Sequence, residues 1–202
     1  YFDGATFLHP GLGFRITFPS GWATQNLPEA VVAVNPQQDA AVQLALAGKM
    51  SAEEAAKRFA GNPNVRVGGL SRTDVNALPA VQANFQARAE QQVIEGTAAF
   101  VEHGGQTFVL LGYAGAGRLA AHAPAIQAAL NSFAAVDPAT IRVEPSRIEI
   151  VTTDAPMTVE EFHAKHPSTI DLGRVALMNG FEPGQTIPAG TAMKRVVGGA
   201  RR

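Results

Sequence analysis

The chain has 202 residues, of which 46% are apolar and 16% are charged, and its formal net charge at pH 7 is −1. This composition belongs to a folded protein with room for one ordinary core and a small second one, and it excludes a general electrostatic attraction to nucleic acid or to an anionic membrane. The absence of cysteine excludes disulfides, thiolate nucleophiles and cysteine-based metal sites. No apolar run reaches the roughly 18 residues of a membrane helix, so we expect no membrane span.

The first quarter of the chain alternates short strand candidates with turn residues. Residues 14–18 alternate apolar and polar side chains, which indicates a strand with one buried face. Ser51 precedes Glu54 by three residues, the spacing of a capping box, and predicts a helix over 52–60 that ends at Gly61. We expect the strands of this part at 6–8, 14–18, 31–34 and 42–46.

More extended runs follow that helix, and a second helix closes this part of the chain. His103-Gly104-Gly105-Gln106 has the residues of a hairpin turn, which predicts two long paired strands on either side of it. Residues 119–133 place Ile126, Leu130 and Phe133 on one face of a helix. We expect the strands at 65–70, 80–87, 93–101 and 107–113. These elements predict an α+β fold, with a mostly antiparallel sheet flanked by two helices.

The last quarter predicts a separate small domain with the element order βααβ. Residues 134–146 contain two prolines and few large apolar side chains, which indicates a linker. We therefore expect a domain at 1–136, a linker at 137–146 and a second domain at 147–202. Within the second domain, strands are expected at 148–151 and 193–196. Between them, one short helix starts at Thr158 with Glu161 as its capping-box partner, and another ends at Asn179-Gly180.

No catalytic constellation is recognisable in the sequence. Residues 115–120 read Gly-Ala-Gly-Arg-Leu-Ala and match the spacing of a dinucleotide fingerprint, but no parallel strand follows, so we interpret them as a strand-to-helix turn. Glu160 and His163 match half of a di-metal motif, and one copy cannot build that site. We interpret His163 as a surface residue. We expect no catalytic residue, no metal site and no cofactor in this chain.

The opening of the chain resembles a known fold. Residues 7–22, Phe-Leu-His-Pro-Gly-Leu-Gly-Phe-Arg-Ile-Thr-Phe-Pro-Ser-Gly-Trp, are similar to the start of the PsbP/Mog-type fold, an antiparallel sheet flanked by helices. The strand at 108–113 and a helix finishing Asn131-Ser132-Phe133 resemble the closing elements of that fold. The resemblance covers residues 1–136. It implies an assembly or binding factor, because such domains share a fold and no active site.

The tail resembles a LysM domain in three segments. These are the threonine-led helix at 158–166, Leu-Met-Asn-Gly-Phe at 177–181, and the closing run at 187–196. The resemblance implies binding of N-acetylglucosamine polymers such as peptidoglycan, through the loops after the first strand and before the last. The candidate binding residues that it implies are Asp154, Met157, Thr158, Asn179, Gly180 and Phe181.

The two modules in this order resemble the C-terminal region of bacterial gluzincin metallopeptidases related to the CAAX-prenyl endopeptidases. The resemblance implies a periplasmic or cell-envelope location and an H-E-x-x-H catalytic domain upstream of Tyr1, so that zinc is expected only in that domain. Because the chain begins at Tyr1 and not at methionine, we expect a mature processed form or a piece of a longer polypeptide.

Our functional expectation is a non-catalytic docking region. It would position a substrate or partner for a zinc-dependent peptidase and tether it to the cell wall. The expected partners are the parent protease domain, another envelope protein or peptidoglycan. The alternative is a free-standing envelope protein that binds peptidoglycan or another glycan.

Overall fold

The computed structural model describes residues 1–89, 92–137, 146–182 and 184–199. The chain divides into two compact units, Tyr1–Ile141 (unit 1) and Arg142–Arg202 (unit 2). The linker predicted at 137–146 lies outside the described residues except for its two ends. Among the helices of the described residues, none has both the length and the apolar character needed to cross a membrane.

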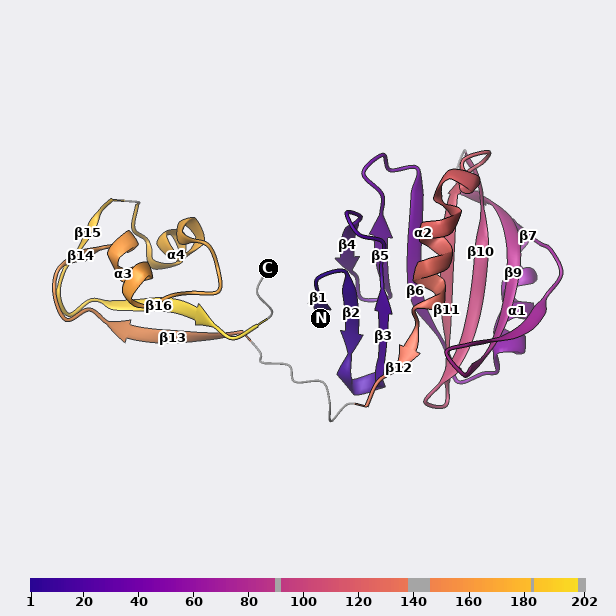
Figure 1. Cartoon of the computed structure of the whole chain (residues 1–202), viewed down its shortest axis with the longest axis horizontal. Helices are drawn as coiled ribbons and strands as arrows, with labels where there is room; N and C mark the ends of the chain where they lie inside the picture. Colours follow the sequence, from indigo (N-terminus) through magenta and orange to yellow (C-terminus); the bar gives the residue numbers. More distant parts are fainter. Residues whose placement is uncertain (90–91, 138–145, 183, 200–202) are drawn as a thin grey trace. The chain divides into compact units, whose positions relative to one another are not determined.

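An eight-stranded antiparallel sheet forms the centre of unit 1 (Figure 1). Its strand order is β4-β5-β6-β11-β10-β9-β7, and β8 also pairs with β9. The strands are β4 (Ala23–Asn26), β5 (Ala30–Val34), β6 (Ala40–Gly48), β7 (Val65–Val67), β8 (Ser71–Val75), β9 (Leu78–Ala89), β10 (Gln92–His103) and β11 (Gln106–Gly115). A four-stranded sheet contains β1 (Phe2–Asp3), β2 (Thr6–His9), β3 (Phe14–Thr17) and β12 (Ala134–Ala135). The helices are the 3-10 helix η1 (Pro10–Leu12), α1 (Ala52–Ala60) and α2 (Leu119–Asn131).

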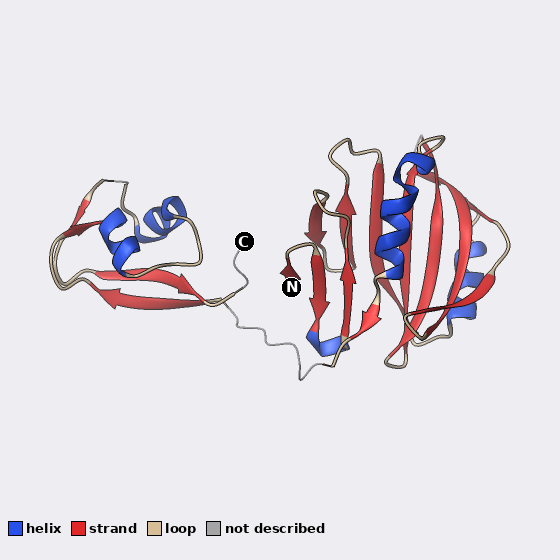
Figure 2. Ribbon diagram, in the orientation of Figure 1, coloured by secondary structure: helices blue, strands red, loops and turns tan. Residues whose placement is uncertain are grey.

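Alternate residues of the long strands face two separate cores, because successive side chains of a strand point to opposite faces of the sheet. On one face, Phe108 and Leu110 of β11 pack with α2 and with the four-stranded sheet. On the other face, Ala98 and Phe100 of β10 pack against α1. Figure 2 shows the two helices on opposite sides of the large sheet. The predicted antiparallel sheet flanked by two helices is therefore confirmed.

The structure differs from the sequence prediction at several places in unit 1, of which three concern the large sheet and α2. The strand predicted at 65–70 is the shorter β7, and β8, which follows it, was not predicted; β8 turns into β9 through Asn76 and Ala77, which both have positive φ. Strand β4 was not predicted, because all four of its residues are exposed and it lacks an apolar alternation. Helix α2 ends at Asn131, so Phe133 enters the core from the segment after the helix.

The glycine-rich segment at 115–120 is a turn between β11 and α2, as predicted. Every strand pair of the described residues is antiparallel, so no dinucleotide-binding unit surrounds it. The backbone N–H of Gly117 donates to the carboxylate of Glu95 at 2.8 Å. A carboxylate of the protein itself thus takes the N–H that a phosphate would need.

Unit 2 contains a two-stranded ribbon and two short helices. The ribbon pairs β13 (Arg147–Thr152) with β16 (Ala192–Val197), and the helices are α3 (Val159–Lys165) and α4 (Leu172–Asn179). Their order matches the predicted βααβ. A short ladder of β14 (Met157–Thr158) and β15 (Thr186–Ile187) was not predicted, because two residues carry no alternation to detect. The core of unit 2 includes Val159, Phe162, Val175 and Met193.

Acid stability of unit 1 is expected to depend on Glu53 of α1. Its carboxylate contacts Lys57 Nζ at 2.8 Å and the guanidinium of Arg72 on β8, and these partners lower the pKa of Glu53 from 4.5 to about 2. A carboxyl group whose pKa is lower in the folded state stabilises that state above pH 4.5, and the stabilisation is lost as pH falls from 4.5 towards 2. We expect Glu53→Gln to flatten the unfolding free energy over this pH range, measured by urea denaturation. If the unfolding free energy of the variant fell with pH as steeply as that of the wild type, Glu53 would not be the group responsible.

Candidate functional site

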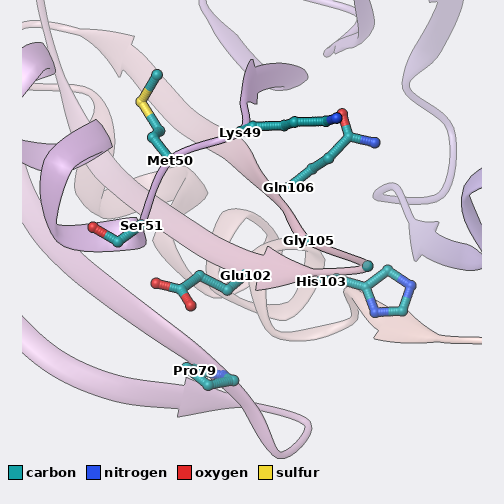
Figure 3. Close-up of a pocket in the computed structure, with 9 residues that line it drawn as sticks. Lys49, Met50, Ser51, Pro79, Glu102, His103, Gly105 and Gln106 are labelled. Atoms are coloured by element: carbon teal, nitrogen blue, oxygen red, sulfur yellow. The ribbon is translucent and has the colours of Figure 1, made fainter.

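A pocket of about 590 Å³ lies in unit 1, where the hairpin between β10 and β11 meets the start of α1 (Figure 3). Three segments build it: the loop from β6 to α1, the start of β9, and the β10–β11 turn. Their lining residues are Lys49, Met50, Ser51, Pro79, Glu102, His103, Gly104, Gly105 and Gln106. The predicted hairpin turn is confirmed, since Gly104 and Gly105 both have positive φ. The turn therefore positions His103 and Gln106 at the rim of the pocket.

Hydrogen bonds fix the loop that precedes α1. The hydroxyl of Thr107 donates to the carbonyl of Met50, and the backbone N–H of Ala52 donates to Glu102 Oε1 at 2.6 Å. Glu102 thus satisfies one of the free N–H groups at the start of α1. Figure 3 shows its carboxylate between Ser51 and Pro79. No other hydrogen bond to this carboxylate occurs among the described residues, so Oε2 stays available for a ligand.

The imidazole of His103 is held by backbone carbonyls. Its Nε2 lies 3.1 Å from the carbonyl oxygen of Leu12 and 2.9 Å from that of Gly13. A carbonyl oxygen only accepts, so this network assigns the proton to Nε2. In this tautomer Nδ1 carries a lone pair.

The pocket has the groups of a binding site and lacks an activated nucleophile. Ser51 is its only hydroxyl, and that group donates to Glu54 Oε2 at 3.0 Å and accepts from the Glu54 N–H. The predicted capping box is therefore present, and it occupies the hydroxyl. Lys49, Glu102, His103 and Gln106 together offer an ammonium group, a carboxylate, an imidazole and an amide. This set recognises a polar ligand through hydrogen bonds and charge.

A second polar cluster in unit 1 connects the turn between β5 and β6 to α2. The carboxylate of Asp39 accepts from Asn35 Nδ2 at 2.6 Å and contacts His122 Nε2 at 3.0 Å and Arg118 Nη1 at 3.2 Å. The hydrogen bond from Asn35, followed by the charges of His122 and Arg118, lowers the pKa of Asp39. Both carboxylate oxygens are therefore in use, and the cluster ties α2 to the sheet.

The predicted binding residues of unit 2 lie around α3 and the end of α4. Thr158 and Glu161 form the predicted capping box, with Glu161 N–H donating to Thr158 Oγ1 at 3.2 Å and Thr158 N–H donating to Glu161 Oε2 at 2.8 Å. Met157 is buried in the core. Asp154 is exposed and contacts Lys165 Nζ at 2.7 Å, and the hydrogen bond from Lys165 lowers the pKa of Asp154.

Asn179 joins α4 to the ribbon. Its amide nitrogen donates to the carbonyls of Val175 at 2.9 Å and Lys194 at 2.8 Å, and its amide oxygen accepts from the Lys194 N–H at 2.7 Å. Gly180 follows with φ of 73° as the C-cap of α4, and Phe181 packs against the core. The polar groups of Thr158 and Asn179 are thus used by the fold, and a role of these six residues in binding stays a prediction.

His163 corrects the interpretation of a surface histidine. Its side chain is half-buried, and its Nδ1 is enclosed without a hydrogen-bond partner in the structure. His163 follows the fully buried Phe162, so α3 turns part of the imidazole inward. Glu160 accepts the Gly184 N–H at 3.0 Å, so it serves as a loop anchor. Within the described part of the chain, no three His, Cys, Asp or Glu residues are placed to hold a metal ion.

Comparison with known proteins bears on the fold. No protein-family model matches the chain, and no curated protein matches its sequence. Among solved structures, cyanobacterial PsbP (CyanoP) from Synechocystis sp. PCC 6803 matches 64% of this chain and 91% of its own length, with 12% identity and a TM-score of 0.51. The chain has a PsbP-like fold. Unit 2 is too short to supply a match of that size, so the PsbP-like part lies mainly in unit 1.

Two further structures are similar. A protein of Bacteroides thetaiotaomicron matches 73% of this chain at 15% identity, with a TM-score of 0.50, and this chain covers 53% of it. The Ran-binding protein Mog1p of Saccharomyces cerevisiae matches 68% of this chain and 97% of its own length at 12% identity, with a TM-score of 0.47. None of the three is named as an enzyme. At these identities the likeness shows the fold alone.

The sequence did not predict the pocket. Lys49 lies in the loop between β6 and α1, whereas Glu102 and His103 end β10, and only the hairpin-turn residues at 103–106 gave a signal near the pocket. The sequence also did not indicate which large apolar side chains of unit 2 are exposed. Leu177 is 82% exposed, and Ile148 and Ile150 are 61% and 68% exposed.

Proposed function

We propose that this chain is a non-catalytic docking region that holds a polypeptide partner in the pocket of unit 1. The observation that carries the proposal is the pocket itself. Glu102 and His103 are fixed by backbone hydrogen bonds on opposite faces of β10, and Glu102 Oε2 is left for a ligand. A binding site benefits from side chains that are already ordered, because less conformational entropy is lost when the ligand arrives.

The chemistry of the pocket fits a polar segment of a protein. Glu102 Oε2 accepts from a backbone N–H group or from a cationic side chain of the ligand. Lys49 is exposed at the rim and complements an acidic side chain. Gln106 both donates and accepts, as a peptide group requires.

The fuller form of the proposal places the chain beside a zinc-dependent peptidase in the bacterial envelope. The module order supports it: the PsbP-like fold is followed by a βααβ unit whose capping box and Asn179-Gly180 helix end are LysM-like features. Zinc would then be bound upstream. The test is the sequence encoded before Tyr1. A signal peptide directly before Tyr1, with no H-E-x-x-H domain between, would exclude the peptidase parent.

Charge changes in the pocket test the docking role. With the purified domain encoded upstream as ligand, we expect Lys49→Glu and Glu102→Gln each to weaken binding by roughly tenfold in calorimetry. Glu102→Gln keeps an acceptor for the Ala52 N–H, so α1 stays capped. Arg15→Glu on β3 is the matched control, since Arg15 is exposed and does not line the pocket. Equal losses in all three variants would contradict a site in this pocket.

The alternative function is glycan binding by unit 2, favoured by its βααβ order. Asp154 is exposed in the loop after β13, where that alternative places the ligand. Co-sedimentation with insoluble peptidoglycan tests it. Protein that stays in the supernatant would exclude the glycan role and leave the docking proposal for unit 1 intact.

A further inference from the structure

The β13–β16 ribbon of unit 2 has one buried face and one exposed face. Val151 and Met193, which lie opposite each other, pack towards the helices. Ile148 and Ile150 lie on the other face, and their side chains are 61% and 68% exposed. Two exposed isoleucines on one short strand are unusual for a surface, where large apolar side chains normally occur singly.

The two edges of the ribbon differ in their hydrogen bonding. The N–H and C=O of Lys194 bond to the side chain of Asn179. The N–H of Val196 donates to Ser168 Oγ, and its C=O accepts from the Thr169 N–H. The outer edge of β16 is therefore closed by side chains and loop backbone.

The outer edge of β13 is open. Since the backbone groups of Lys194 and Val196 point away from β13, their partners Ile150 and Ile148 form the non-hydrogen-bonded pairs of the ladder. The N–H and C=O groups of Ile148 and Ile150 consequently point away from β16. Across the described ranges, β13 pairs with no strand other than β16. This edge has no proline and no bulge, and its two charged residues, Arg147 and Glu149, have opposite signs.

We propose that two copies of this chain associate through antiparallel pairing of β13 with β13 of the second copy. A two-fold axis at Ile148 brings the outward backbone groups of Ile148 against those of Ile148 in the second copy. The same axis places Arg147 of each copy opposite Glu149 of the other copy, so the junction contains two pairs of opposite charge. Opposite charges directly across an antiparallel pair are stabilising. The contact is the same patch on both copies, as two-fold symmetry requires.

The charges select this register over its neighbours. An axis at Glu149 sets two carboxylates directly opposite each other, and an axis at Ile150 sets Glu149 opposite Val151. Arg147 is available for the new pair, because its side chain is 70% exposed and lies 3.6 Å from its own Glu149, which binds Arg195 more closely at 2.7 Å. The result is a four-stranded sheet, β16-β13-β13-β16, that continues across both copies. This inference is independent of the proposed function of unit 1.

Mixing two charge variants of the full chain tests the pairing. Alone, Arg147→Glu sets glutamates opposite each other and Glu149→Arg sets arginines opposite each other, so we expect each to raise the dimer dissociation constant by roughly tenfold or more in sedimentation velocity. An equimolar mixture of the two variants restores both opposite-charge pairs. We expect it to form a heterodimer with a dissociation constant close to that of the wild-type dimer. Lys194→Glu is the control, because Lys194 is exposed on β16 away from the junction. It is expected to dimerise as the wild type does.

Glu149→Arg also removes the ion pair between Glu149 and Arg195 within one copy, so a second test uses a variant that changes only the backbone of β13. Ile148→Pro removes an N–H that has no partner within one copy, so the ribbon stays folded by circular dichroism while the dimer is lost. A wild-type chain that remains monomeric over the whole concentration series would overturn the proposal. So would an Ile148→Pro variant that dimerises normally, or a mixture no more dimeric than its components.

Discussion

Replacing Phe162 by alanine is expected to unfold unit 2 and leave unit 1 folded. Phe162 is fully buried, and among the described residues of unit 2 it packs in a core with six other buried side chains. Truncating a buried phenylalanine costs about 3–5 kcal/mol, from the lost transfer free energy and the cavity that remains. A domain of this size has a total unfolding free energy of only a few kcal/mol, because small domains bury a smaller fraction of their surface.

The measurement is hydrogen exchange resolved along the chain, with denaturant unfolding beside it. Amides of α3, α4 and β16 are expected to lose protection in Phe162→Ala, and those of β10 and β11 to keep it. Leu177→Ala is the matched control, because it removes a large apolar side chain from the same unit at a position 82% exposed, and we expect a change within about 0.5 kcal/mol. Loss of protection in both units would show that they unfold together.

Local signals in the sequence were sufficient for most elements of the fold. The two capping boxes at Ser51 and Thr158 start helices at the predicted positions, because each box is a contact between residues three apart. The Gly104-Gly105 turn fixes the register of β10 and β11, because positive φ at both positions gives the twist that a tight hairpin needs. The PsbP/Mog-type fold was likewise predicted from a contiguous motif and agrees with the similarity to CyanoP.

Features that depend on contacts between distant residues were not predictable. The pocket joins Glu102 to the N–H of Ala52, and His103 to the carbonyls of Leu12 and Gly13, across separations that periodicity does not report. The prediction missed the edge strand β4 for a different reason: all its residues are exposed, and among the described strands it pairs only with β5. In unit 2, the sequence indicated Asn179 as a binding residue, and the structure uses its amide to close the edge of β16.

Gly112→Ala is expected to destabilise unit 1 by about 3 kcal/mol, because α2 packs directly on the sheet at this glycine. A Cβ at Gly112 would lie 2.1 Å from Ile126 Cγ2 and 3.0 Å from Leu130 Cδ1, both on α2. The φ angle of Gly112 is not positive, so the cost is steric. Gly115→Ala on the same strand is the control, since a Cβ there meets nothing within 4 Å and stability should change little.

A double-mutant cycle separates this clash from a general loss of packing. Ile126→Ala alone leaves a cavity and costs about 2–5 kcal/mol. It also removes the Cγ2 atom that the new methyl group would meet, so in the double variant the methyl group partly fills the space. We expect the double variant to be less destabilised than the sum of the single variants, by about 0.5–3 kcal/mol in urea unfolding. Strict additivity would mean that α2 does not rest on the sheet at Gly112, and that the packing of Ile126 against β11 differs from the structure.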